Sequence, residues 1–155
     1  MAIRALQPKG FGRPLGMYSH GMEANGLVVV AGQVGTTPDG GLAGPDVEAQ
    51  TRQVFENVAT VVGAAGCTMR DVIRLQTFLV SADDIAGYMA ARQEVFPRYF
   101  PSGVYPPNTL LVISRLVRPE FRVEVEALAV RPTRPAAPGA ARRRPQPPRR
   151  PARRR

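Results

Sequence analysis

The chain has 155 residues, 44% of them hydrophobic, which is the size of one ordinary domain and enough to bury a core without disulfides or metal. No apolar run approaches the roughly 20 residues that span a bilayer, and the N-terminus lacks the apolar segment of a secretory signal, so we expect a cytoplasmic protein with no membrane contact. One cysteine, Cys67, and one histidine, His20, exclude an internal disulfide and a Cys/His zinc cluster, and the formal charge of +9 comes from residues 131–155 alone.

The first predicted element is a β-hairpin. Residues 18–24 and 27–34 form two short runs suited to strands, and they flank Asn25-Gly26. This dipeptide is favoured in two-residue type I′ turns, because both of its residues accept a positive φ. The pattern therefore predicts two antiparallel strands joined by a tight turn.

A helix is expected next, over residues 47–65. Apolar residues recur there every three or four positions, which is typical of one buried helical face. Asp46 can cap the start of this helix, and Gly66 suits its end. Residues 72–80 then have the apolar and β-branched composition of a strand.

A second helix is predicted to begin near Ser81 and to end before Pro101. Ser81 followed by Asp84 resembles a capping box, although aspartate replaces the usual glutamate or glutamine. In a capping box both side chains would bond backbone amides of the first helical turn. We therefore expect Asp84 to face the start of its own helix.

Two strands complete the predicted domain, over residues 109–117 and 122–130. In the last strand Glu124 and Glu126 alternate with apolar residues, so the glutamates share one face of the sheet. The order of elements is β-hairpin, α, β, α, β, β. It indicates an α+β fold in which two helices cover one face of a mixed sheet.

The chain is predicted to divide into a domain of residues 1–130 and a disordered tail of residues 131–155. The tail holds ten arginines, seven prolines and no acidic residue, and such a segment cannot bury enough surface to order itself. The domain holds 11 basic and 12 acidic residues, a net charge of −1. Either the tail is a solvated extension without a role, or it binds nucleic acid or an acidic protein in a salt-dependent way.

Residues 14–131 resemble the RidA/YjgF family, also called the Rid or L-PSP family. The landmarks that carry the resemblance follow in order along the whole domain: Gly16-Met-Tyr18-Ser-His-Gly21, Val30-Ala-Gly-Gln33, Glu48 to Gln53 with Glu56-Asn57, Ala64 to Gly66, Asp71-Val72, Thr77 to Leu79, Arg115-Leu116 and Val123 to Ala127. The resemblance implies a chorismate-mutase-like fold that forms a homotrimer with clefts between its subunits.

The resemblance also implies an activity, the hydrolytic deamination of reactive enamines and imines such as 2-aminoacrylate, without a cofactor. The expected partner is a small-molecule substrate. The alternative is a non-catalytic trimer that binds a metabolite or a protein, with the basic tail contacting polyanions. Ribonuclease activity attributed to some relatives raises nucleic-acid binding as a third possibility, for which only the tail supplies positive charge.

Five positions match site residues of the family. Glu124 corresponds to the glutamate that positions the attacking water, and Tyr18 to the tyrosine of the pocket. Gly32 corresponds to a pocket glycine, and Ala31 stands where the family has serine. Asn108 replaces the arginine that pairs with the substrate carboxylate, and asparagine offers hydrogen bonds but no charge. The chain is therefore expected to be a divergent member with altered specificity.

Other residues compete less well for a place in the site. Leu110 occupies a position where cysteine is frequent, and Met89 one where asparagine is frequent. Arg92 and Arg118 could approach the cleft and replace the lost charge, whereas Arg115 would face away from Asn108 on a regular strand. A lone histidine such as His20 is more often a hydrogen-bonded surface residue, Glu126 is expected to be structural, and Cys67 is expected to be inert.

Overall fold

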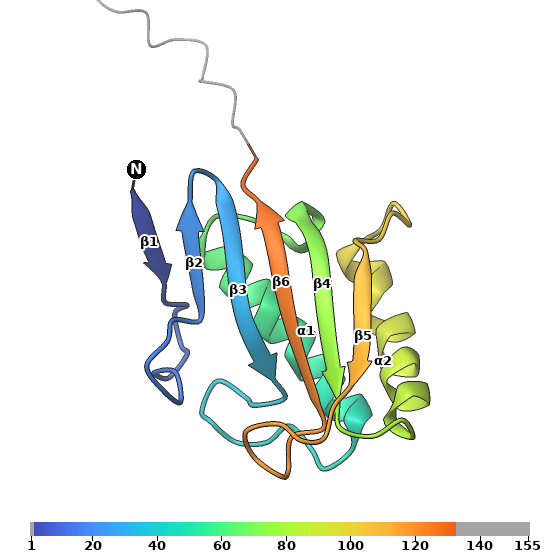
Figure 1. Ribbon diagram of the computed structural model, residues 1–155. Coiled ribbons are helices and arrows are strands. Elements are labelled where there is room, and N and C mark those ends of the chain that lie inside the picture. Colours follow the sequence, from blue (N-terminus) through green and yellow to red (C-terminus); the bar gives the residue numbers. More distant parts are fainter. Residues whose placement is uncertain (1, 133–155) are drawn as a thin grey trace, which may run out of the picture.

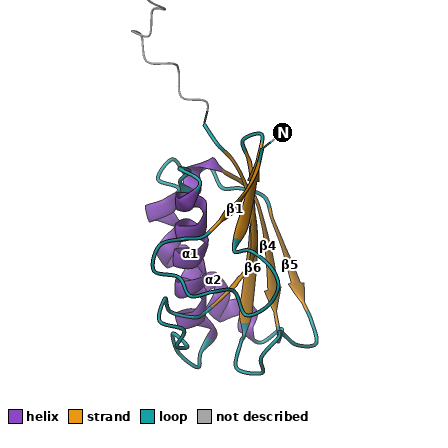
Figure 2. Cartoon of the chain, turned by 90° about the vertical axis from the view of Figure 1, so that its left-hand side faces the viewer, coloured by secondary structure: helices purple, strands orange, loops and turns teal. Residues whose placement is uncertain are grey.

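The computed structural model describes residues 2–132, and its central feature is one six-stranded sheet with the strand order β1-β2-β3-β6-β4-β5 (Figure 1). Strands β4 and β5 are parallel, and all other neighbours are antiparallel. Both α-helices lie on one face of the sheet, and no helix or strand of residues 2–132 covers the other face (Figure 2). The predicted α+β fold, a mixed sheet with two helices on one face, is confirmed. The bounds are β1 Ile3–Leu6, β2 Gly21–Ala24, β3 Leu27–Val34, α1 Val47–Ala64, η1 Met69–Asp71, β4 Val72–Leu79, α2 Asp84–Tyr99, β5 Asn108–Val112 and β6 Val123–Val130.

The predicted hairpin and the first helix have the expected local chemistry. Asn25 and Gly26 adopt φ values of 51° and 81°, as the turn between β2 and β3 requires. At the start of α1, the side chain of Asp46 accepts a hydrogen bond from the amide of Ala49 at 2.7 Å. Just beyond its end, Gly66 has a φ of 76°, a conformation that glycine adopts without a steric penalty.

The core lies between the sheet and α1. Alternate residues of the central strands point toward the helix and are buried, and the remainder point to the uncovered face. In β6 the four apolar residues of the helical side are at most 3% exposed, namely Val123, Val125, Ala127 and Ala129. Glu124 and Glu126 consequently lie together on the uncovered face, as the alternation predicted.

Strand β1 was not predicted, because four residues are too short for a clear pattern. It pairs with β2 at the edge of the sheet and buries Leu6 in the core. Arg4 in this strand forms an ion pair with Glu23, which also binds Arg131 at 2.8 Å. Hydrogen bonds from Arg4 and Arg131 lower the pKa of Glu23. One carboxylate thus joins both ends of the described chain.

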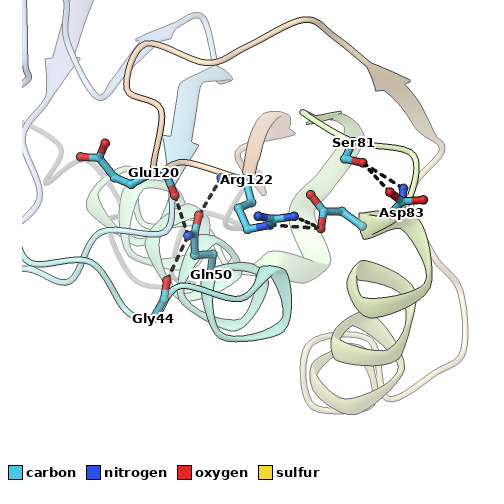
Figure 3. Close-up of polar contacts among 7 residues, drawn as sticks. Gly44, Gln50, Ser81, Asp83, Glu120 and Arg122 are labelled. Carbon is cyan, nitrogen blue, oxygen red and sulfur yellow. Dashed lines mark hydrogen bonds and ion pairs between the residues drawn. The ribbon is translucent and has the colours of Figure 1, made fainter.

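The start of α2 differs from the prediction. Ser81 Oγ accepts a hydrogen bond from the amide of Asp83, but Asp84 does not complete a capping box. Its carboxylate instead binds the guanidinium of Arg122, at 2.7 and 3.1 Å from one oxygen (Figure 3). The Asp84 side chain is 7% exposed and that of Arg122 is 39% exposed, so the carboxylate is removed from water while the guanidinium remains partly exposed. The contact spans 38 positions and could not be foreseen from local spacing.

Replacing Asp84 with alanine should therefore cost about 2 kcal/mol in the free energy of unfolding, the loss expected for a partly buried, charge-assisted hydrogen-bonded pair. Replacing Ser81 with alanine should cost less than about 0.5 kcal/mol, as is usual for an exposed site. Urea denaturation of both variants measures the two costs. A larger loss for the Ser81 variant would instead support a capping box at this helix.

Strand β5 begins one residue before the prediction and ends at Val112 rather than at residue 117. No helix within residues 2–132 is long and apolar enough to cross a membrane. The predicted disordered tail lies outside the described residues, apart from Arg131 and Pro132. The amide of Arg131 donates to Gly26 O at 2.7 Å, so the sheet region continues to this residue.

Candidate functional site

The candidate site is built around a contact between β3 and β6. The pairing of these strands shifts between Val30 and Gln33, where β3 carries one extra residue. This bulge places Gly32 directly beneath the side chain of Glu124. An ideal Cβ added at Gly32 would lie only 2.5 Å from Glu124 Cδ, so the glutamate occupies space that any other residue would fill. The structure thus brings together two of the predicted site residues.

Glu124 has the environment expected of a group that exchanges protons. It is half-buried on the uncovered face of the sheet. Burial raises the pKa of its carboxyl group, and the negative charge of Glu126 raises it further. Among the described residues, no hydrogen-bond donor or cation satisfies this carboxylate. Its oxygens remain available to a water molecule or a substrate.

Tyr18 and Gly32 line the same cavity, which has a volume of about 170 Å³. Its wall is formed by residues 11–20, the end of β3, the loop at 36–40, Asn57 and Arg118. The hydroxyl of Tyr18 accepts a long hydrogen bond of 3.4 Å from the amide of Leu15, so it retains the capacity to donate. The cavity therefore adjoins Glu124 through Gly32 and is also lined by the phenol of Tyr18.

His20 also lines this cavity, but its imidazole is engaged locally. Its Nε2 lies 3.1 Å from Gly12 O, and its ring packs edge-on against Phe11 with a centroid distance of 5.2 Å. This arrangement agrees with the expected role of a hydrogen-bonded surface residue. Cys67 is buried, and burial raises the pKa of its thiol, which disfavours the reactive thiolate.

Asn108 lies on the other side of the sheet from Glu124. It pairs with the buried Leu75 at the start of β5, and its amide points toward α2. Its Oδ1 accepts from Thr77 Oγ1 at 3.1 Å, and its Nδ2 donates to the hydroxyl of Tyr88 at 3.3 Å. These bonds occupy about half of the hydrogen-bonding capacity of the amide. One chain alone does not bring Asn108 to Glu124.

The sequence did not indicate that Thr77 and Tyr88 are the neighbours of Asn108. Both are fully buried, and their hydroxyls are 2.8 Å apart. A tyrosine in a helix is more often a core residue than a site residue. Tyr88 was therefore not predicted to lie near the site. The argument about Arg115 also needs correction, because β5 ends before it. The Arg115 Nε donates to Leu116 O at 3.4 Å in the segment that follows the strand.

Ala31, the remaining residue that was predicted to bind substrate, lies at the uncovered face of the sheet. Ala31 lines a shallow hollow with Arg74, Gln76, Glu126 and neighbouring residues of β3 and β6. Several large apolar side chains of this face are 37% to 50% exposed: Met22, Leu27, Val29, Ile73 and Leu111. Among the described residues, no group of three or more His, Cys, Asp or Glu side chains could hold a metal ion.

The fold and the site define a class of small α+β proteins in which two helices cover one face of the sheet and a carboxylate lies on the other. The family model described as endoribonuclease L-PSP matches residues 12–131. The chain belongs to this family, the RidA/YjgF family.

Named relatives agree with this assignment. The chain is 31% identical over 117 residues to a 2-iminobutanoate/2-iminopropanoate deaminase of Salmonella typhimurium, a match that covers 76% of this chain and 89% of the relative. It is 33% identical over 118 residues to a RutC family protein of Pyrococcus horikoshii, with the same coverage.

Solved structures show the same fold. The Escherichia coli protein TdcF with bound serine superposes with a TM-score of 0.76 at 27% identity, and the match covers 83% of this chain and 99% of TdcF. The YjgF gene product of the same species gives a TM-score of 0.76 at 26% identity, with the same coverage.

Proposed function

We propose that the chain is a hydrolase that deaminates a reactive enamine or imine. The observation that carries this proposal is the half-buried carboxylate of Glu124, which has no partner among the described residues and lies over Gly32 beside the cavity of Tyr18. The Salmonella relative is named for the deamination of 2-iminobutanoate and 2-iminopropanoate. Hydrolysis of such an imine needs a positioned water and a group that moves protons, and it needs no metal or cofactor.

The proposed reaction is simple in its bond changes. Glu124 holds a water molecule and accepts one of its protons as the water oxygen attacks the imine carbon. The π electrons of the C=N bond move to nitrogen, which then receives the proton from Glu124. As the C=O bond forms, Glu124 takes the second proton of the water and passes it to the nitrogen, so the C–N bond breaks and the nitrogen leaves as ammonia. A raised pKa helps Glu124, because a carboxyl group that ionises nearer to neutrality transfers protons in both directions more readily.

The proposal includes a cleft between subunits of a homotrimer. Glu124 and Asn108 lie on opposite sides of the sheet within one chain, so a ligand can touch both only if two chains meet. The uncovered face offers the surface for such a meeting. Its exposed Met22, Val29 and Leu111 form the kind of apolar patch that a soluble protein usually covers.

The pocket is expected to differ from that of other family members. Asn108 cannot supply the charge of an arginine, and its amide is already bound to Thr77 and Tyr88. Asn108 by itself therefore cannot pair with a substrate carboxylate as an arginine does. We therefore expect a specificity that differs from that of family members with arginine at this position.

The activity can be tested by ammonia release from 2-iminobutanoate generated in situ by a pyridoxal-phosphate enzyme. The expected result is faster release with the purified protein than in the buffer reaction. A neutral imine should be tested in parallel. If neither imine is hydrolysed faster than in buffer, the hydrolase proposal is wrong, and a non-catalytic trimer that binds a metabolite becomes the better account.

The pH dependence of this activity should report on the Glu124–Glu126 pair. If ionised Glu124 is the active form, kcat/KM should rise with pH through the raised pKa of this group, above the ordinary value for glutamate. Replacing Glu126 with glutamine removes a negative charge that raises this pKa, so the rising limb should move to lower pH. Rate profiles of both proteins between pH 4 and pH 8, a range of about four units that begins near the ordinary glutamate pKa, provide the measurement. An unchanged profile would mean that Glu124 does not control the rate.

A further inference from the structure

Arg92 is the charged residue of α2 that lacks an ionic partner within the described part of the chain. The helix carries three other charged side chains, and each is paired: Asp84 with Arg122, Glu94 with Arg52, and Arg98 with Glu56. Arg92 is half-buried, yet no carboxylate within residues 2–132 neutralises it. A partly desolvated guanidinium without a counter-charge can bind an anion.

Aromatic side chains hold Arg92 in place. Residues 88, 92 and 96 follow each other at four-residue intervals on one stripe of α2, so their side chains are neighbours. The guanidinium lies 4.3 Å from the ring centroid of Phe96 and 5.8 Å from that of Tyr88. Stacking of this kind limits the motion of the side chain, and the guanidinium has more N–H donors than its contact with the Tyr88 hydroxyl uses.

The same guanidinium is linked to Asn108 through Tyr88. Burial raises the pKa of the Tyr88 phenol, whereas its hydrogen bond with Thr77 and the nearby charge of Arg92 lower it. The Tyr88 hydroxyl accepts a hydrogen bond from Asn108 Nδ2 at 3.3 Å. An asparagine amide has a second N–H, which these contacts do not use. The guanidinium of Arg92 and the amide of Asn108 are therefore both neighbours of Tyr88, at the α2–β5 edge of the sheet.

We infer that Arg92 is the residue that determines specificity for an anionic substrate, binding a carboxylate together with the free N–H of Asn108. This inference rests on the proposed function, whose substrate class it narrows to imines that carry one carboxylate. A single guanidinium matches the charge of one carboxylate and its two-oxygen geometry. A phosphate monoester carries about two charges near neutral pH, more than one arginine balances.

Two other arginines are the alternatives. Arg118 and Arg13 line the cavity of Tyr18 and Gly32. Arg118 already lies 3.8 Å from a carboxylate oxygen of Glu120 and faces the ring of Phe121, so part of its charge is compensated. Arg13 is exposed on a loop, where water screens its charge. Neither has a partly buried, uncompensated position comparable to that of Arg92.

The inference is tested by ligand binding, which does not require turnover. The full-length protein is titrated calorimetrically with 2-oxobutanoate, the carboxylate product of 2-iminobutanoate hydrolysis, and with the neutral amide 2-oxobutanamide. R92Q should weaken binding of 2-oxobutanoate at least tenfold and leave the Kd of the amide within about twofold. R92K keeps the charge but loses the planar fork, so it should weaken carboxylate binding by a smaller factor.

Control variants separate the outcomes. R118Q and R13Q test the two alternative arginines and should not show the selective loss of 2-oxobutanoate binding. R52Q, at an exposed ion pair, is the control for the loss of an arginine on a helix surface and should bind both ligands as the wild type does. If R92Q does not fold, R92K decides the matter with the same pair of ligands. The inference is overturned if the wild type does not bind 2-oxobutanoate. It is also overturned if the Arg92 variants discriminate between the ligands as the wild type does, or if R118Q or R13Q shows the selective loss.

The binding experiment is independent of the hydrolase assay. If the wild type releases ammonia but the Arg92 variants do not selectively lose carboxylate binding, only the inference about the carboxylate is wrong. If 2-oxobutanoate binds in a way that depends on Arg92 but no imine is hydrolysed, only the proposed reaction is wrong.

Discussion

Replacing Glu124 with glutamine is expected to slow imine hydrolysis by a factor of about 100 or more, the usual contribution of a positioned acid–base group. Glutamine keeps the shape of the side chain over Gly32 and removes its ability to carry a proton. The measurement is the initial rate of ammonia release at saturating substrate. Because the change affects proton transfer rather than ligand contact, kcat should fall much more than KM changes.

The same variant should remain folded. The pKa of Glu124 is raised in the folded protein, so at neutral pH the ionised group opposes folding relative to the unfolded chain. This penalty is absent below the unfolded pKa and grows as pH rises. Replacing the acid with a neutral amide removes it, so the Tm at neutral pH should not decrease. A large loss of activity with an equal loss of Tm would show that Glu124 is structural.

Gly32 provides an independent test of the same contact. A methyl group at this position would collide with the Glu124 side chain, whose flexible end can move away. Gly32→Ala should therefore reduce activity by displacing the carboxylate, with little change in stability. Gly35→Ala is the matched control, because its methyl group would lie 2.8 Å from Gln50 Cα in the backbone of α1, and this variant should lose stability instead. An active Gly32→Ala protein would argue against a catalytic Glu124.

Replacing Gln50 with alanine is expected to lower the free energy of unfolding by about 3 kcal/mol, from the loss of three buried hydrogen bonds. Gln50 is fully buried in α1, and its side-chain amide connects two loops (Figure 3). Its Nε2 donates to Gly44 O at 3.0 Å and to Glu120 O at 2.9 Å, and its Oε1 accepts from the amide of Arg122 at 2.9 Å. Removing the amide leaves three backbone groups without their partner.

Urea denaturation provides the measurement, and Gln53→Ala is the control. Gln53 is half-buried in the next turn of the helix and makes one side-chain bond, to Asn57 Oδ1 at 2.9 Å, so its loss should cost about 1 kcal/mol or less. A Gln50 variant as stable as the wild type would contradict the prediction and would mean that water replaces the hydrogen bonds of the Gln50 amide. Because the segment at residues 120–122 leads directly into β6, the Gln50 variant should also hold Glu124 less firmly and lose part of its activity.

Local chemistry was sufficient to predict much of the fold. The Asn25-Gly26 turn and the Asp46 cap depend on contacts between residues close in sequence, so their signals are visible in a single chain. Strand β1 and the true role of Asp84 depend on partners 19 and 38 positions away, at Glu23 and Arg122. Such pairings leave no periodic pattern, which is why the prediction missed β1 and assigned Asp84 to a cap.

The candidate site shows the same division. Alternation along β6 predicted the face on which Glu124 lies, and the structure adds the bulge that brings it over Gly32. Alternation could not show that Asn108 points toward α2, because that depends on the parallel pairing of β5 with β4. The contact of Asn108 with Tyr88 also depends on this parallel pairing, so the sequence did not predict it.

The place of β6 in the sheet has a consequence for how the molecule assembles. This strand is the last along the described chain, yet it lies between β3 and β4 and is the element that joins the β1–β3 half of the sheet to the β4–β5 half (Figure 1). A growing polypeptide therefore cannot close its sheet until residue 130 is free to pair. Until then the inner edges of β3 and β4 stay open to unwanted strand pairing, and the long-range contacts of β6 should make folding slow for a protein of this size.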